Sequence, residues 1–247
     1  MKAMVLAAGL GTRLRPLTDS IPKPLLPLGP HPLLVWNLLL LRKYGVTDVV
    51  INLHHRGEQI RQVIGSGVQY GLHVTYSPEP VLLGTGGGIK QAEAHFQGEP
   101  FLVLNGDTIV DLDLAAMIAC HHRNQAIATM ALRDDQDVDR WGAIESNDRD
   151  HVLRINGKGN RKGSSQQVAI RRMFAGVHVL DPLLLRDVPP EVFSSIIDAY
   201  EKWLERDAIV AGYVFSGYWT DVGTPERYEQ VKQDLAAGHL QLPSLAR

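Results

Sequence analysis

Short, wholly apolar runs alternate with longer runs through the first part of the chain. The short runs predict buried strands at Lys2–Leu6, Val49–Leu53, His73–Tyr76 and Phe101–Leu104. The longer runs predict helices at Leu33–Tyr44, Glu58–Ile64 and Gly88–His95. This alternation is typical of a parallel sheet that is covered on both faces. Ligands of such sheets bind beyond the carboxyl ends of the strands, so we expect the site in the loops after Leu6, Leu53, Tyr76 and Leu104.

The pattern changes near Ala126 to shorter alternating runs. These predict antiparallel strands at Ala128–Leu132, Gly142–Glu145, Val152–Ile155 and Ala175–Leu180. Helices are expected at Ser194–Glu205 and Pro225–Leu235. We therefore expect one domain over residues 1–235 and a C-terminal tail over residues 236–247. The segment Arg154–Arg172 is rich in Gly, Ser and cations. One interpretation of this composition is a hairpin tip that carries solvated charge.

Composition narrows the class of partner. The 247 residues carry 25 Lys and Arg against 27 Asp and Glu, a balance that argues against nucleic acid but not against a small polyanion. The N-terminus does not resemble a signal peptide, and the apolar run Pro32–Leu41 is shorter than the about 20 residues of a membrane span. With Cys120 as the one cysteine, we expect a cytoplasmic enzyme without a membrane partner, and a homodimer is left open.

The loop after the first predicted strand carries the first chemical motif. Small residues and glycines allow a ligand to approach its backbone closely, and the cations Arg13 and Lys23 can contact an anion. A dinucleotide-binding turn would have a third glycine where this chain has Leu14. A glycine-rich turn that only packs closely is the structural alternative, but it explains neither cation.

Two motifs resemble the sugar nucleotidylyltransferase family. Gly9–Arg13 and Pro22–Pro24 match its Gly-x-Gly-Thr-Arg and Pro-Lys-Pro elements, and Trp219–Pro225 matches its distal Trp-x-Asp-Val-Gly-Thr-Pro element. The resemblance extends from Met1 to about Leu235. It implies a three-layer α/β/α, Rossmann-like fold, with a mixed, mostly parallel sheet and a small antiparallel sugar-binding lobe. It also implies that a nucleoside triphosphate and a sugar 1-phosphate react by in-line displacement at the α-phosphorus.

The same resemblance assigns roles on the nucleotide side. Arg13, Lys23 and Asp107 are the implied catalytic residues, and Asp107 and Asp221 the implied Mg²⁺ ligands. Glu79 is a candidate base contact, with a surface charge at a strand end as the alternative. Asp111 and Asp113 are interpreted as helix-entry or surface acids. The implied nucleotide-binding residues are Leu6, Ala7, Ala8, Gly9, Gly11, Thr12, Arg13, Glu79, Gly84, Thr85 and Gly86.

On the sugar side the match to the family is looser. The resemblance implies contacts from Asn105, Gly142 and Gly176. Where the family often has Glu-Lys-Pro, this chain has Asn156-Gly157-Lys158, so Lys158 is the candidate for the sugar phosphate and no glutamate is carried over.

Two other functions compete with this one. One is a non-catalytic module of the same fold that senses a nucleotide sugar, and the other is a cytidylyltransferase that acts on a different phosphate. Retention of Arg13, Lys23, Asp107 and Asp221 disfavours the sensor. The base and the sugar stay open, although the glycine-rich loop near Gly84 looks most like mannose-1-phosphate guanylyltransferases and N-acetylmuramate-1-phosphate uridylyltransferases.

Overall fold

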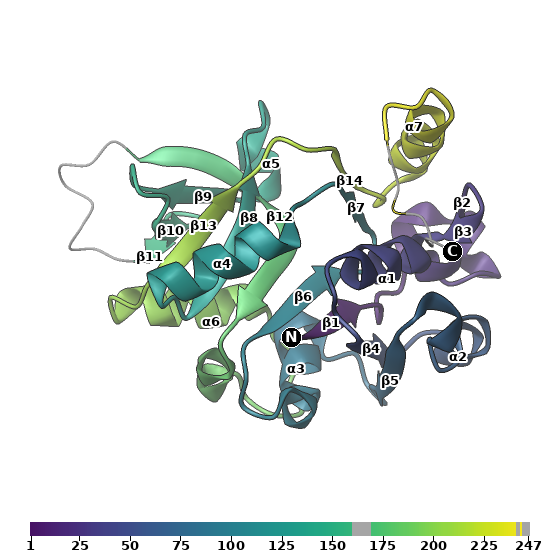
Figure 1. Ribbon diagram of the computed structural model, residues 1–247, viewed down its shortest axis with the longest axis horizontal. Helices are drawn as coiled ribbons and strands as arrows, with labels where there is room; N and C mark the ends of the chain where they lie inside the picture. The colour runs from purple at the N-terminus through teal and green to yellow at the C-terminus, as the bar shows by residue number, and fades with distance from the viewer. Residues whose placement is uncertain (160–168, 241–242, 244–247) are drawn as a thin grey trace. The chain divides into compact units, whose positions relative to one another are not determined.

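The computed structural model describes residues 1–159, 169–240 and 243. The chain forms two compact units, each built from separate stretches of sequence (Figure 1). The first unit comprises Met1–Leu82, Leu104–Leu112 and Gly217–Arg247, and the second Leu83–Val103 and Asp113–Ser216. Strand β6 (Phe101–Asn105) passes from the second unit into the first.

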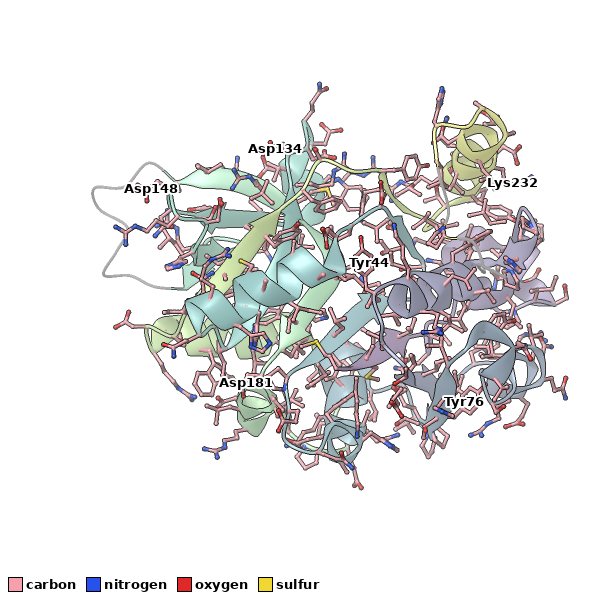
Figure 2. The ribbon with its side chains drawn as sticks, viewed as in Figure 1. Tyr44, Tyr76, Asp134, Asp148, Asp181 and Lys232 are labelled. Atoms are coloured by element: carbon pink, nitrogen blue, oxygen red, sulfur yellow. The ribbon has the colours of Figure 1, made fainter. Side chains whose placement is uncertain are left out.

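Parallel strands form the centre of the first unit. β1 (Lys2–Leu6) pairs with β4 (Asp48–Leu53), which pairs with β5 (His73–Pro78). Leu6, Asn52 and Ser77 are aligned across the strands near their carboxyl ends, so the loops that follow the strands begin side by side. Tyr76 on β5, labelled in Figure 2, donates a hydrogen bond to the Gly65 carbonyl at 2.6 Å.

The other elements of the first unit are short or helical. Its helices are α1 (Leu33–Lys43), α2 (Gly57–Ile64) and α7 (Pro225–Ala236), with 3₁₀ turns at Thr12–Leu14, Leu17–Asp19, Lys23–Leu25 and Val68–Tyr70. Two antiparallel pairs complete it, β2 (Pro27–Leu28) with β3 (His31–Pro32), and β7 (Thr108–Val110) with β14 (Trp219–Asp221). α1 is buried from Leu33 to Leu41, which fits its run of leucines.

The second unit is built mainly on antiparallel strands. β12 (Ile170–Leu180) pairs with β8 (Ala128–Arg133) and β9 (Ala143–Ser146), and β9 pairs with β10 (Val152–Ile155). β10 continues into β11 (Lys158–Gly159), and β13 (Val210–Val214) adds to β8 in parallel. Its helices are α3 (Gly84–Gln91), α4 (Leu114–Asn124), α5 (Val138–Trp141) and α6 (Ile196–Glu205), with 3₁₀ turns at Glu93–Phe96 and Pro182–Asp187.

The predicted α/β class with a mixed sheet is confirmed, and most predicted elements are present. The predicted helix Gly88–His95 is misplaced, because α3 begins at Gly84 and ends at Gln91. Asp113 is the N-cap of α4, where its carboxylate accepts a hydrogen bond from the Ala116 amide at 2.9 Å. Among the described residues no helix is long and apolar enough to cross a membrane.

Candidate active site

The loop after β1 holds Gly11 close to other atoms and leaves Gly9 open. Gly11 has φ +66°, and a Cβ there would lie 3.1 Å from Lys23 Cβ and 3.2 Å from Thr18 Cγ2. The Thr18 hydroxyl donates to the Gly11 carbonyl at 2.8 Å. Gly9, in contrast, is exposed, and a Cβ there would meet nothing within 4 Å. Only glycine suits position 11, while the backbone at position 9 is open to a ligand.

Lys23 and Arg13 both lie in the first unit, near acidic side chains. Lys23 stands on a 3₁₀ turn, is 9% exposed, and its ammonium is hydrogen-bonded to Asp107 Oδ2. Arg13 is exposed, and its Nη2 lies 3.2 Å from the position of a Cβ on Gly223, two residues after Asp221. The two cations expected at the phosphates are therefore both close to the predicted metal ligands.

The chain around Asp107 is held against the end of β1. The Gly106 amide donates to the Leu6 carbonyl at 2.9 Å, and a Cβ on Gly106 would lie only 2.6 Å from that oxygen. Glycine is thus required between Asn105 and Asp107 for this close approach.

Asp107 immediately precedes β7, and Asp221 is the last residue of its antiparallel partner, β14. Asp221 is the register partner of Thr108, and the Val222 amide donates to the Asp107 carbonyl at 2.9 Å. The two acids that the sequence separates by more than a hundred residues are brought together by β7 and β14. Asp221 ends β14, a three-residue strand that the sequence pattern did not predict.

The electrostatics at Asp221 favour an added cation. Burial raises the pKa of the Asp221 carboxyl, and the neighbouring Asp107 raises it further, while Lys23, Arg227 and Arg13 act in the opposite direction. Arg227 Nη1 donates to Asp221 Oδ2 at 3.0 Å. Asp221 Oδ1 is buried and has no hydrogen-bond partner within the part of the chain that the structure describes. An oxygen in this state is suited to binding a metal ion.

Glu79 belongs to a buried network at the ends of β4 and β5. It is 4% exposed, and its Oε1 accepts a hydrogen bond from Asn52 Nδ2 at 2.7 Å. The Asn52 Oδ1 in turn accepts from the Ala7 amide at 2.7 Å, and the ring of His54 contacts the Glu79 carbonyl at 2.9 Å. The interpretation of Glu79 as a surface charge is therefore wrong. Sequence reasoning missed Asn52, although a polar residue within the apolar run VVINL was a usable signal.

In the second unit, the glycine-rich loop packs against the segment that leads into α6. The Gly86 amide donates to the Ser194 carbonyl at 2.9 Å, and Thr85 Oγ1 accepts from the Ile196 amide at 3.0 Å. Gly84 has φ +71°, and a Cβ on Gly86 would lie 2.8 Å from Ser194 Oγ. Part of this glycine pattern is thus explained by packing within the unit.

The sugar-side candidates lie in both units. Asn105, half-buried, ends β6 in the first unit. Gly142 and Gly176, in the second, have φ of +84° and +76°, and a Cβ on Gly142 would lie 2.6 Å from Asn156 Oδ1. Gly176 falls where the pairing of β12 with β8 shifts register.

Lys158 stands on the hairpin that joins β10 to β11. Asn156 and Gly157 have φ of 50° and 78°, as a two-residue hairpin turn requires. The Lys158 ammonium pairs with Glu201 at 3.1 Å, and its side chain is 68% exposed. The Asn-Gly pair thus has a structural explanation, and residues 160–168 of the Arg154–Arg172 segment lie outside the described residues.

Comparison with known proteins supplies the family. A family model described as nucleotidyl transferase matches residues 2–238. The chain belongs to the nucleotidyl transferase family. An N-acetylmuramate alpha-1-phosphate uridylyltransferase of Neisseria meningitidis is 51% identical over 117 residues, which cover 47% of this chain and 51% of the relative. A mannose-1-phosphate guanylyltransferase of Mycobacterium tuberculosis is 31% identical over 98% of this chain and 67% of the relative. The match thus spans about half the length of the first relative and about two thirds of the second.

A solved nucleotidyltransferase has the same fold. The structure of a UDP-glucose pyrophosphorylase complexed with UDP-glucose aligns with a TM-score of 0.75 over 96% of this chain and 98% of that one, at 21% identity. The match to the family model confirms the family expected from the motifs at Gly9–Pro24 and Trp219–Pro225. Four family-predicted residues, Arg13, Lys23, Asp107 and Asp221, lie close together within the first unit.

Proposed function

We propose that this chain transfers a nucleotidyl group from a nucleoside triphosphate to a sugar 1-phosphate and releases pyrophosphate. Family membership and the names of both relatives support a transferase of this class. The observation that carries the proposal is the cluster in the first unit, where Lys23 contacts Asp107 and the β7–β14 pairing brings Asp221 beside it. A cluster of two cations and two acids after glycine-rich backbone suits chemistry on polyphosphates.

In the proposed reaction, an oxygen of the sugar 1-phosphate attacks the α-phosphorus of the triphosphate. The new P–O bond forms as the bond to the β-phosphate breaks, and pyrophosphate carries away the electron pair. Because two polyanions must meet, the main task of the protein is to position them and to reduce their repulsion. The Arg13 guanidinium and the Lys23 ammonium act on the phosphates, and the backbone from Leu6 to Thr12 receives the nucleotide. No nucleophilic side chain is needed, so buried Cys120 has no role in this chemistry.

Mg²⁺ is the proposed cofactor, with Asp107 and Asp221 as its protein ligands. The two carboxylates fit the ion, because Mg²⁺ prefers one or two carboxylates completed by water and phosphate oxygens. The buried Asp221 Oδ1, which lacks a hydrogen-bond partner among the described residues, supports this assignment. When bound, the ion supplies positive charge that offsets the charge of the phosphates.

The remaining contacts are proposed from the family resemblance. Glu79 would contact the base, with the loop Gly84–Gly86 along the base and ribose, and Lys158 would contact the sugar phosphate. Asn105, Gly142 and Gly176 would contact the sugar. As the chain has one cysteine and balanced charge, we propose a cytoplasmic enzyme that uses no nucleic-acid or membrane partner.

A substrate panel tests this function. GTP, UTP, dTTP, CTP and ATP are each paired with mannose 1-phosphate, N-acetylmuramate 1-phosphate and glucose 1-phosphate, and pyrophosphate release is measured with Mg²⁺. At least one pair should turn over in the wild type and lose nearly all turnover in Asp221→Asn. Nucleotide-sugar binding without turnover of any pair would instead support a sensing module of the same fold.

A further inference from the structure

The side chain of Asn52 joins two loops that the proposed function uses for different parts of the nucleotide. It lies near the end of β4, between Leu6 on β1 and Ser77 on β5, and is 2% exposed. Its Oδ1 accepts from the Ala7 amide at 2.7 Å, and its Nδ2 donates to Glu79 Oε1 at 2.7 Å. One buried amide therefore contacts both the loop after β1 and the carboxylate after β5.

The direction of these hydrogen bonds is determined by chemistry. The Ala7 amide can only donate, so the oxygen of Asn52 must face it. The nitrogen of Asn52 then faces Glu79, and Glu79 must present an acceptor. A flipped Asn52 would place two donors against each other and two acceptors against each other. Neither an aspartate nor a leucine at position 52 could make both bonds.

From this network we infer that Asn52 is a positioning residue for the nucleotide. It holds the Ala7 amide in place at the phosphate loop and keeps Glu79 oriented as a hydrogen-bond acceptor toward the base. The inference rests on the proposed function and on the proposed base contact of Glu79. An acceptor that faces the ring nitrogen of the pairing edge favours bases with a ring N–H there, namely guanine, uracil and thymine. It disfavours cytosine and adenine, which present a ring-nitrogen acceptor there.

Three variants separate positioning from simple packing. Asn52→Asp keeps the acceptor for the Ala7 amide but sets a second carboxylate against Glu79, which removes the bond and adds repulsion. Adding Glu79→Gln restores a donor–acceptor pair with its direction reversed, because the new amide can donate to the new carboxylate. The double variant should therefore regain stability, and because the nitrogen of the new amide faces position 52, its oxygen still offers the base an acceptor. Glu79→Gln alone has the opposite result, because Asn52 Nδ2 must face the amide oxygen, which leaves the amide nitrogen, a donor, toward the base.

The experiment measures the urea midpoint of unfolding, the KM of each substrate, and the base preference. The base preference is the ratio of turnover with the best triphosphate to turnover with CTP. Asn52→Asp should raise the KM of the triphosphate at least about tenfold and leave that of the sugar 1-phosphate within about twofold. The double variant should recover most of the urea midpoint and most of the preference for the best triphosphate over CTP, whereas Glu79→Gln alone should keep the urea midpoint and lower that preference at least about tenfold. Asn124→Asp is the control in the second unit, because the Asn124 amide likewise uses both its ends: its nitrogen donates to Cys120 and its oxygen contacts the ring of His151. It should leave both KM values and the preference unchanged.

Two results would overturn the inference. One is an unchanged triphosphate KM in Asn52→Asp. The other is a Glu79→Gln variant that keeps the wild-type base preference, since the orientation that Asn52 imposes on residue 79 would then have no effect at the base. A wild type that releases no pyrophosphate with any pair would contradict the proposed function instead. Calorimetric titration of GTP, UTP and CTP into wild type and variants would then still test the network, with loss of the affinity difference in Glu79→Gln and its return in the double variant as the expected results.

Discussion

Replacement of Lys23 by methionine tests the centre of the site, because it removes the ammonium and keeps the length of the side chain. The side chain of Lys23 is 11% exposed and that of its partner Asp107 is 32% exposed. Loss of one partner costs about 3–5 kcal/mol in a buried pair, and exposed pairs contribute about 0–1 kcal/mol. For this intermediate pair we expect Lys23→Met to lower the free energy of unfolding by about 1–3 kcal/mol, measured by urea titration without ligand. The sequence alone suggests a cation that acts only on phosphates, and loss of such a cation would leave the free energy of unfolding unchanged.

Activity should fall by more than the stability loss explains. Removing a cation placed at the reacting phosphates should lower kcat by about 10²–10³-fold under conditions where the variant is fully folded. The double variant Lys23→Met/Asp107→Asn removes both charges, so it should regain part of the stability but none of the turnover. Lys232→Met is the control, because Lys232 (labelled in Figure 2) pairs with Glu229 at 2.9 Å on the exposed side of α7. Near-normal kcat in Lys23→Met would refute the phosphate role.

Three further outcomes are expected. Asp221→Asn should weaken Mn²⁺ binding at least about tenfold when the metal alone is titrated and followed by electron paramagnetic resonance, and unchanged binding would contradict its role as a ligand. Lys158→Ala should raise the KM of the sugar 1-phosphate more than that of the triphosphate, and if neither KM changes the residue only pairs with Glu201 on the hairpin. Burial lowers the pKa of His178 to about 3, so the unfolded chain takes up a proton first as the pH falls. The stability present above about pH 6.5 should therefore decline by about 1.4 kcal/mol per pH unit toward pH 3, and His178→Gln should flatten this slope in urea titrations between pH 7.5 and 5.

Prediction from the sequence worked best for helices and strands that are determined by their own local pattern of residues. The buried strands β1, β4 and β6 are short apolar runs, and α1 is a continuous leucine-rich run, so local pattern and tertiary burial agree. β7 and β14 were missed because each has three residues, too few for a period to be detected. Their pairing depends on contacts between distant parts of the chain. The start of α3 was missed because glycines are poor helix formers, and here they are favoured by packing against the segment near Ser194.

The site shows the same division between motif and environment. The motifs identified Arg13, Lys23, Asp107 and Asp221, but gave no sign that Lys23 is buried and paired with Asp107. The partners of Asn52 lie 45 and 27 residues away along the chain, a separation that no local pattern encodes. Sequence can name a reactive side chain from its motif, whereas its burial and partners depend on the folded chain.

Charge at Asp221 connects stability with the proposed chemistry. Burial and Asp107 raise the pKa of its carboxyl, so the ionised form is less favourable in the folded protein than in water. The sign follows from linkage: this carboxyl favours folding only at pH values where it is protonated, and it disfavours folding as the pH rises through its pKa. At neutral pH the fold therefore bears a cost that Arg227, Lys23 and Arg13 reduce but do not remove. An asparagine would avoid that cost and still fit between the same neighbours. The proposed role as a Mg²⁺ ligand gives a reason for a carboxylate at this position, where folding alone does not favour one.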